Sequence, residues 1–230
     1  DALIGAGYGS AGERCMAISA VVAVGAVADP LIAAIETRAR AIPVGASDAP
    51  GVEMGPLVTA AHRERVAGFV DQGAAEGARL RLDGRGIVVK GHEQGFFLGP
   101  TLFDQVTPQM TIYREEIFGP VLIVLRVQTL DEAIALVNAN PYGNGTALFT
   151  ASGEAARRFE TEIQVGMVGI NVPIPVPASF FSFGGWKASL FGDLHAYGPE
   201  SVNFYTRGKV VSARWPQRQA QATGLSMPTP

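Results

Sequence analysis

The sequence is poor in cysteine, since Cys15 is the only one among 230 residues. A lone thiol excludes any disulfide within the chain, and such a chain is typical of a reducing compartment. A free cysteine is usually a small buried apolar side chain, and it is reactive only where its surroundings favour the thiolate. The residues around Cys15 must therefore decide between these two interpretations.

The chain also lacks an excess of charge and any long apolar run. Its formal net charge is −3 and its 18 Lys and Arg residues form no cluster, so nothing favours nucleic acid or an anionic membrane as a partner. A membrane-spanning helix needs about 20 apolar residues, and Asp29-Pro30 interrupts the longest candidate. With 47% apolar residues, the sequence predicts one large globular domain with a substantial core.

Two kinds of catalytic motif are missing as well. His62, His92 and His195 are scattered and show no ligand spacing, so we expect no metal site. No Gly-x-Ser-x-Gly motif is present, which argues against a serine nucleophile on a strand-to-helix turn. The chain starts at Asp1 without Met, a basic segment or a cleavage motif, so we expect no signal peptide and a start inside a longer protein.

Apolar periodicity predicts an α/β fold, with a largely parallel sheet that carries helices on both faces. A Thr-Leu-Asp-Glu capping box begins one of the helices at Thr129. The expected strands are Ala20 to Val27, a short one near Leu80, Phe97 to Phe103, Val121 to Val127, Thr146 to Thr150 and Gly166 to Val172. The expected helices are Ala11 to Ser19, one that starts at Asp29-Pro30, Thr59 to Glu76, one that starts at Thr129, and Gly153 to Ile163.

The C-terminal part has a different character. Residues 173–200 form a long loop that is too apolar for a linker, and such loops tend to contribute to functional sites. Val202 to Val211 alternates like an exposed edge strand, which needs a partner, and a polar tail follows from Gln217. We therefore expect residues 1–200 to form a catalytic domain, and residues 201–230 to form an oligomerisation strand and tail.

The run Gly7-Tyr-Gly-Ser-Ala-Gly12 matches the dinucleotide-binding pattern Gly-x-Gly-x-x-Gly, and Asp29 lies near the acidic position of that pattern. The pattern requires a full strand before it, and only Ala2-Leu3-Ile4 is available. A single match among 28 glycines is readily obtained by chance. We therefore interpret this run as a flexible approach to Cys15.

Cys15 is surrounded by features that favour a thiolate. It follows the glycine-rich turn, it falls in the first turn of the helix expected over Ala11 to Ser19, and Arg14 is its neighbour. A guanidinium also binds carboxylates in a two-pronged fashion, so Arg14 could hold a substrate carboxylate beside the thiol. Cys15 is thus predicted to be reactive.

Glu115 and Glu116 come directly before Ile117-Phe118-Gly119-Pro120 at the start of an expected strand. They are too close in sequence to act as a pair of acid and base across a substrate. They could be two exposed acids in a turn, or one of them could accept hydrogen bonds from a ribose diol.

Four motifs together resemble the catalytic half of the aldehyde dehydrogenase superfamily, in order and approximate spacing. They are Gly12-Glu-Arg-Cys15-Met-Ala, Leu98-Gly-Pro-Thr-Leu102, Glu115-Glu-Ile-Phe-Gly-Pro120 and Phe183-Gly-Gly-Trp-Lys187. The resemblance covers nearly the whole chain, from about Gly5 to Val211.

A narrower resemblance is to the methylmalonate-semialdehyde dehydrogenase branch, which also handles malonate semialdehyde and uses coenzyme A. It rests on Ile170-Asn-Val-Pro-Ile-Pro-Val-Pro177, Phe180-Phe-Ser-Phe183, Gly192-Asp-Leu-His-Ala-Tyr-Gly198 and Val202-Asn-Phe-Tyr-Thr206, and on an arginine directly before the cysteine. The branch implies a role in valine or inositol catabolism.

The resemblance implies a role for each motif residue. Cys15 would be the nucleophile and would form a thioester, Arg14 would bind the substrate carboxylate, and Phe183 would line the aldehyde pocket. Glu116 would bind the nicotinamide ribose of NAD and Phe118 would pack near the nicotinamide. Coenzyme A would finally take the acyl group, so that loss of CO2 yields propionyl-CoA or acetyl-CoA.

The resemblance also implies that an N-terminal NAD-binding domain, a general base, an oxyanion asparagine and a second arginine lie outside this chain, so the chain alone is expected to be inactive. Two alternatives remain open, namely a hydrolytic aldehyde dehydrogenase that releases a free acid, and an inert truncation that serves as an oligomerisation or binding module. We expect a homodimer or homotetramer, in the bacterial cytoplasm or alternatively in a mitochondrial matrix.

Overall fold

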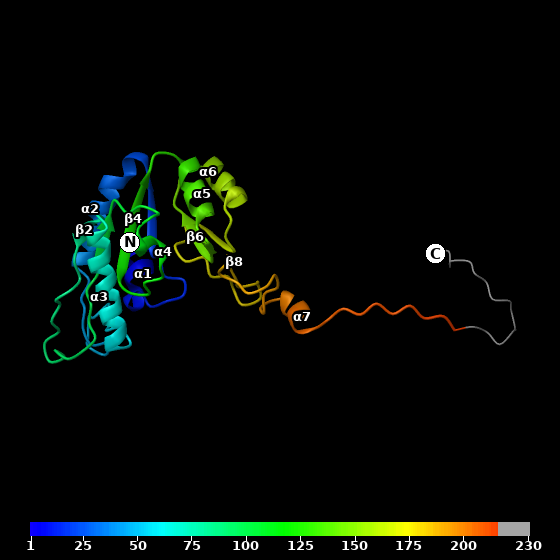
Figure 1. The fold of residues 1–230 in the computed structure, drawn as a ribbon, viewed down its shortest axis with the longest axis horizontal. Helices are drawn as coiled ribbons and strands as arrows, with labels where there is room; N and C mark the ends of the chain where they lie inside the picture. Colours follow the sequence, from blue (N-terminus) through cyan, green and yellow to red (C-terminus); the bar gives the residue numbers. More distant parts are fainter. Residues whose placement is uncertain (216–230) are drawn as a thin grey trace.

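The computed structural model describes residues 1–215, and its largest sheet has four strands in the order β1-β4-β3-β2 (Figure 1). The strands are β1 (Ala20–Val24), β4 (Val121–Val127), β3 (Thr101–Asp104) and β2 (Arg79–Leu82). β1 and β3 both pair with β4 in parallel, and only the edge strand β2 is antiparallel. The predicted α/β class with a mostly parallel sheet is confirmed.

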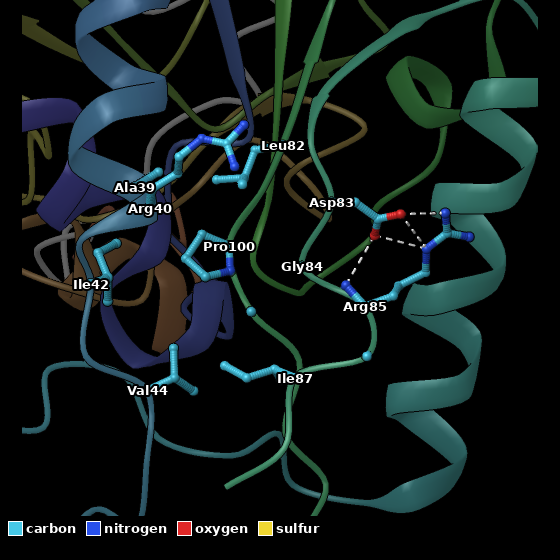
Figure 2. A pocket seen from close by; sticks show the side chains of 12 residues that line it. Ala39, Arg40, Ile42, Val44, Leu82, Asp83, Gly84, Arg85, Ile87 and Pro100 are labelled. Atoms are coloured by element: carbon cyan, nitrogen blue, oxygen red, sulfur yellow. Dashed lines mark hydrogen bonds and ion pairs between the residues drawn. The ribbon is translucent and has the colours of Figure 1, made fainter.

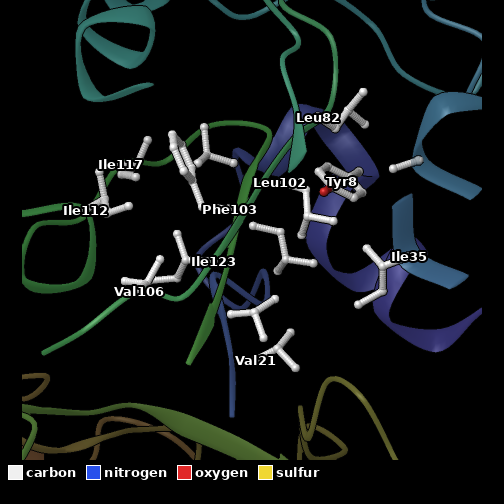
Figure 3. Packing of buried hydrophobic residues seen from close by; sticks show 14 of the residues in the cluster. Tyr8, Val21, Ile35, Leu82, Leu102, Phe103, Val106, Ile112, Ile117 and Ile123 are labelled. Atoms are coloured by element: carbon white, nitrogen blue, oxygen red, sulfur yellow. The ribbon is translucent and has the colours of Figure 1, made fainter. Parts of the chain in front are cut away.

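Helices cover both faces of this sheet. They are α1 (Ala2–Tyr8) and α2 (Ala28–Arg40) on one face, and α3 (Ala60–Ala75) and α4 (Thr111–Arg114) on the other. Side chains of the central strands alternate between the two faces: Leu102 points toward Tyr8, whereas Phe103 points toward Ile112 (Figure 3). Because both faces are covered, β4 is buried from Val121 to Leu125, as expected for a parallel strand inside a sheet.

Local capping explains where three helices begin. Thr59 accepts a hydrogen bond from the His62 N–H at the start of α3. Thr129 does the same for Glu132 in α5 (Leu130–Ala139), and Ser152 for Ala155 in α6 (Gly153–Glu162). Each hydroxyl satisfies an N–H that has no partner within its helix. These helices match the predicted ones to within a residue or two.

The later strands form separate pairs. β6 (Gly145–Leu148) pairs in parallel with β7 (Met167–Ile170), and β5 (Tyr142–Gly143) pairs antiparallel with β8 (Trp186–Lys187). The β6–β7 pair and helices α5 and α6 share their own small core around Phe159. The expectation of one continuous sheet was wrong here, because apolar alternation marks a strand without indicating which strand it pairs with.

Two other expectations were wrong. No α-helix covers Ala11 to Ser19. A 3-10 turn, η1 (Gly9–Gly12), stands there instead, because Ser10, Ala11 and Gly12 all have positive φ of 53°, 53° and 72°, which a right-handed helix cannot accommodate. The strand expected over Val202 to Val211 does not start at Val202, since α7 (Glu200–Tyr205) covers its first part.

Two predicted strands are shorter than expected. β1 ends at Val24 where the 3-10 turn η2 (Gly25–Val27) begins, and β3 starts only at Thr101. The polar tail predicted from Gln217 lies outside the described residues. None of the helices within residues 1–215 is long and apolar enough to cross a membrane.

Candidate functional site

The Cys loop, residues 12–16, lies directly against the 116–120 loop that precedes β4. Gly12 has a φ of 72°, and a Cβ at this position would sit 2.1 Å from the carbonyl oxygen of Gly119. Only glycine permits this backbone-to-backbone contact. Residues more than a hundred positions apart thereby form one site.

Cys15 is exposed, and it is the chain's one thiol. It lies in a turn in which the Ala17 N–H donates to the carbonyl of Arg14 at 3.0 Å. On the other side, the Asn144 side-chain amide donates to the carbonyl of Cys15 at 3.3 Å and lies 3.1 Å from the Met16 sulfur. The Cys loop is therefore held by its own turn and by Asn144, which lies between β5 and β6. No helix begins at Cys15, so the helix dipole that was expected to favour its thiolate is absent.

Arg14 folds back over the end of α1. Its Nη2 donates to the carbonyls of Gly5 at 2.6 Å and Ala6 at 3.1 Å, and it covers Gly9, where a Cβ would lie 2.9 Å from Nη2. A cation is favourable beside the last carbonyls of a helix. Its Nε is buried and makes no hydrogen bond among the described residues. Arg14 thus fixes the approach to the thiol.

Helix α3 binds three consecutive carbonyls of the 116–120 loop. Arg65 donates to Glu116 at 3.0 Å and to Ile117 at 3.1 Å, and His62 Nε2 lies 2.7 Å from the Phe118 oxygen. Phe118 itself has a φ of 56°, which is an unfavourable conformation for a bulky residue. These three contacts hold the loop in that conformation.

Glu13 connects the Cys loop to the same helix. Its side chain is only 10% exposed, and its Oε1 lies 3.4 Å from His62 Nε2 and accepts from the Val58 N–H at 3.5 Å. The carboxylate thus faces the start of α3, where the helix dipole favours negative charge.

Two of the predicted site residues, Glu116 and Phe118, have exposed side chains. The Glu116 carboxylate is exposed and has no hydrogen-bond partner within residues 1–215. The Phe118 side chain is 38% exposed, although its backbone is fixed. The site therefore combines a thiol, a carboxylate that can accept hydrogen bonds and an aromatic face.

Phe183 lies in the long loop and packs edge-to-face on Tyr197, with ring centroids 6.1 Å apart. The neighbouring Ser182 bonds to Glu200 and contacts His195. Asn144 connects the Phe183 loop to the Cys loop: a Cβ on Gly185 would lie 3.0 Å from the Asn144 Cα, and the Asn144 amide donates to the Cys15 carbonyl.

Sequence reasoning missed His62, Arg65, Asn144 and Glu13. All of them act on backbone groups or on one another across the fold, and such contacts leave no pattern in the sequence. The one available signal was the polar pair at spacing i, i+3 near the start of α3, which places His62 and Arg65 on one helix face.

A cavity of about 510 Å³, drawn in Figure 2, is lined by residues outside this site. It is bounded by the end of α2 and the segment after β2, and its cations are already paired, Arg40 with Glu36 and Arg85 with Asp83 and Asp71. It contains none of the predicted site residues. Within the described part of the chain, no group of three His, Cys, Asp or Glu side chains could hold a metal ion.

Comparison with known proteins finds relatives that are named as semialdehyde dehydrogenases. Malonate-semialdehyde dehydrogenase of Pseudomonas aeruginosa is 60% identical over 231 residues, which cover 100% of this chain and 46% of that protein. The mitochondrial acylating methylmalonate-semialdehyde/malonate-semialdehyde dehydrogenase of Bos taurus is 49% identical over 99% of this chain and 42% of that protein. The chain spans less than half the length of these relatives.

Solved structures agree. The crystal structure of methylmalonate-semialdehyde dehydrogenase from Oceanimonas doudoroffii has a TM-score of 0.88 at 55% identity, over 94% of this chain and 44% of that one. A putative methylmalonate-semialdehyde dehydrogenase from Sinorhizobium meliloti, solved with NAD, has a TM-score of 0.89 at 50% identity over the same shares. The sequence model described as "Aldehyde dehydrogenase family" matches residues 1–211. The chain belongs to the aldehyde dehydrogenase family.

Proposed function

We propose that this chain supplies the thiol-bearing half of an NAD-dependent, coenzyme A-acylating dehydrogenase for malonate or methylmalonate semialdehyde. The observation that carries the proposal is the Gly12–Gly119 contact, which sets the loop of the only cysteine against the loop of Glu116 and Phe118. Relatives of 49% to 60% identity are named for these two substrates.

The exposed groups fit a nicotinamide nucleotide. The Glu116 carboxylate can accept hydrogen bonds from a ribose diol, and the exposed Phe118 ring can pack on a flat heterocycle. NAD, when bound, supplies the hydride acceptor. Because α3 fixes the carbonyls of residues 116–118, both side chains are presented from a rigid backbone, which favours an oriented nucleotide.

Cys15 is the proposed nucleophile. Its thiolate adds to the aldehyde carbon, and its own backbone N–H, which makes no hydrogen bond within residues 1–215, is available to the resulting oxyanion. Loss of hydride leaves an acyl thioester on Cys15. A carboxylate β to the thioester carbonyl can then leave as CO2, which gives a thioester enolate that takes up a proton from solvent. The thiol of coenzyme A then attacks the thioester carbonyl, takes the acyl group and releases Cys15 as its thiolate.

Arg14 and Phe183 are proposed to select the substrate. Two carbonyls occupy Arg14 Nη2, whereas Nη1 makes no hydrogen bond among the described residues, so it can donate to a substrate carboxylate. Phe183 would form a wall of the aldehyde pocket. Removal of the guanidinium in Arg14→Ala should therefore harm carboxylated aldehydes more than propanal.

The test uses the protein in the longest form that its gene encodes. NADH formation is followed with malonate semialdehyde, methylmalonate semialdehyde and propanal, with and without coenzyme A. We expect turnover that requires coenzyme A, no turnover in Cys15→Ser, and acyl-CoA as the product.

Rapid NADH formation with release of a free acid and no need for coenzyme A would favour a hydrolytic enzyme instead. Equal losses on propanal and on the semialdehydes in Arg14→Ala would refute the carboxylate contact. Absence of any aldehyde oxidation in the intact protein would leave the chain as a binding or assembly module.

Residues 1–200 are proposed to be the catalytic domain, and residues 201–230 to join subunits of a homo-oligomer. Large apolar side chains are exposed after α7 begins, with Val202 at 64%, Tyr205 at 73% and Trp215 at 90%, and a partner subunit would cover them. Light scattering after chromatography should give a dimer or tetramer, and a variant truncated after Pro199 should be monomeric. A monomeric intact protein would contradict this assignment.

The location that we propose for the protein is a reducing compartment, either the bacterial cytoplasm or a mitochondrial matrix.

A further inference from the structure

His62 stands where the two loops of the site meet, and it has no part in the proposed chemistry. We infer that His62 and Glu13 form a clasp that positions Phe118 relative to Cys15, which makes His62 a positioning residue for the nucleotide. The expected effect on the KM for NAD rests on the proposed function, whereas the link between the two loops does not.

The hydrogen-bond geometry fixes the state of the imidazole. His62 Nε2 lies 2.7 Å from the Phe118 carbonyl oxygen, and a carbonyl can only accept, so Nε2 carries the proton. The Glu13 carboxylate lies on the other side of this nitrogen, with its Oε1 3.4 Å from Nε2, which is within ion-pair distance when the imidazole is protonated. His62 Nε2 therefore lies between a carbonyl of the 116–120 loop and a carboxylate of the Cys loop.

The clasp is shielded from water. The side chains of His62 and Glu13 are 22% and 10% exposed, so replacement of this donor by solvent is hindered. The backbone anchors of both residues are firm: Thr59 accepts from the His62 N–H at 3.1 Å, and Glu13 follows Gly12, which is pressed against Gly119.

Each end of the clasp is attached to a loop that carries a predicted site residue, Cys15 on one side and Phe118 on the other. Glu13 precedes Cys15 by two residues, so its carboxylate anchors the backbone that carries the thiol. Phe118 has a positive φ, a conformation that persists only where surrounding contacts enforce it, and the imidazole binds the carbonyl of that same residue. Arg65 holds the preceding carbonyls, but it makes no contact with the Cys loop among the described hydrogen bonds. His62, by contrast, contacts both loops through one nitrogen.

The first readout needs no enzymatic activity. Since Cys15 is the only cysteine, the rate of alkylation by iodoacetamide reports this thiol alone. We expect His62→Ala and Glu13→Ala each to raise that rate about threefold or more, because a lost hydrogen bond of this kind changes an equilibrium by about 2- to 10-fold. The double variant should be no faster than the faster single variant, since both remove one clasp.

The second readout is kinetic. His62→Ala should raise the KM for NAD about 3- to 10-fold and leave the KM for the aldehyde unchanged. His62→Gln should restore the KM for NAD, because its amide N–H can donate to the Phe118 carbonyl. The matched control is His92→Ala, which removes an exposed histidine outside the site and should change neither readout. A purely structural role of His62 would lower the active fraction and hence kcat, with no change in KM for NAD.

The outcomes separate the clasp from the proposed function. Additive effects of the two single variants on alkylation, or no effect of either, would overturn the clasp. An unchanged KM for NAD in His62→Ala would overturn its positioning role. If the intact protein oxidises no aldehyde, the proposed function fails, and the alkylation cycle still decides whether the clasp exists.

Discussion

Gly12→Ala is the sharpest perturbation of the site, because this glycine meets two independent demands. Its φ is 72°, and an L-residue in the left-handed region costs about 1 to 2 kcal/mol. Its Cβ would lie 2.1 Å from the Gly119 oxygen and 2.5 Å from the Gly119 carbonyl carbon, and relief of such overpacking costs about 1 to 3 kcal/mol. We therefore expect Gly12→Ala to lower the free energy of unfolding by about 2 to 5 kcal/mol.

Two other glycines supply matched controls. Gly51 has a φ of 79° with nothing within 4 Å of a built Cβ, so Gly51→Ala should cost only the conformational part, about 1 to 2 kcal/mol. Gly68 lies inside α3 with nothing within 4 Å of a built Cβ, so Gly68→Ala should stabilise the protein by about 0.5 to 1 kcal/mol. All three changes have the same effect on the unfolded chain, so their differences isolate the folded-state terms.

The assay is urea unfolding followed by far-ultraviolet circular dichroism, since Trp186 and Trp215 are 51% and 90% exposed and their fluorescence would report little. Cys15 alkylation on the folded variants gives the second measurement. Gly12→Ala should be the least stable of the three and should change the alkylation rate, whereas the controls should not change it. A Gly12→Ala variant as stable as Gly51→Ala would show that the contact between the two loops is dispensable.

Two buried polar groups give further predictions. Asp104 is 1% exposed and accepts from Arg126 Nε and Nη2 at 2.8 Å each. Because Arg126 is 33% exposed, Asp104→Asn should cost about 2 to 3 kcal/mol in urea unfolding, less than a fully buried pair. Burial raises the pKa of Asp104, but the hydrogen bonds from Arg126 and Gln105 outweigh it, so the net pKa is lowered. This stabilisation is present above the ordinary pKa of aspartate and is lost as the pH falls below it, so Asp104→Asn should show a weaker loss of stability in acid titrations. Tyr8 donates to the carbonyl of Thr101 at 3.0 Å, and Tyr8→Phe should cost about 1 kcal/mol. Burial raises the pKa of Tyr8, so its stabilising effect holds below about pH 10 and is lost above, and Tyr8→Phe should resist alkaline unfolding better.

The sequence predicts those elements whose signals are local. β4 spans the predicted residues Val121–Val127, α5 begins after the predicted cap Thr129, and α3 and α6 begin within a residue of their predicted starts. A cap, an apolar period and a breaker act within a few residues of one another, so one sequence suffices to find them. The separation of the β6–β7 pair from the main sheet depends on which strands meet in space, and the sequence pattern carries no such information.

The site was predictable only at the level of motifs. Glu116, Phe118 and the Cys loop were identified by resemblance, and the structure brings them together. The contacts that hold them, from His62, Arg65 and Asn144, end on backbone carbonyls. Any hydrogen-bond donor of suitable length can make such a contact, so no residue type or spacing in the sequence predicts it.

The glycine run before the thiol shows how a familiar spacing can arise from packing alone. An α-helix and not a strand precedes it, so it lacks the context of a dinucleotide-binding turn. A Cβ built at Gly7 would meet the Leu122 side chain at an ordinary contact distance of 3.4 Å, whereas one at Gly9 would lie 2.9 Å from the Arg14 guanidinium and one at Gly12 would lie 2.1 Å from the Gly119 carbonyl oxygen. A side chain at the last two positions would displace Arg14 or the 116–120 loop. The helix expected at Cys15 is absent, and the placement of the thiol depends instead on these glycine contacts and on the Glu13–His62 clasp.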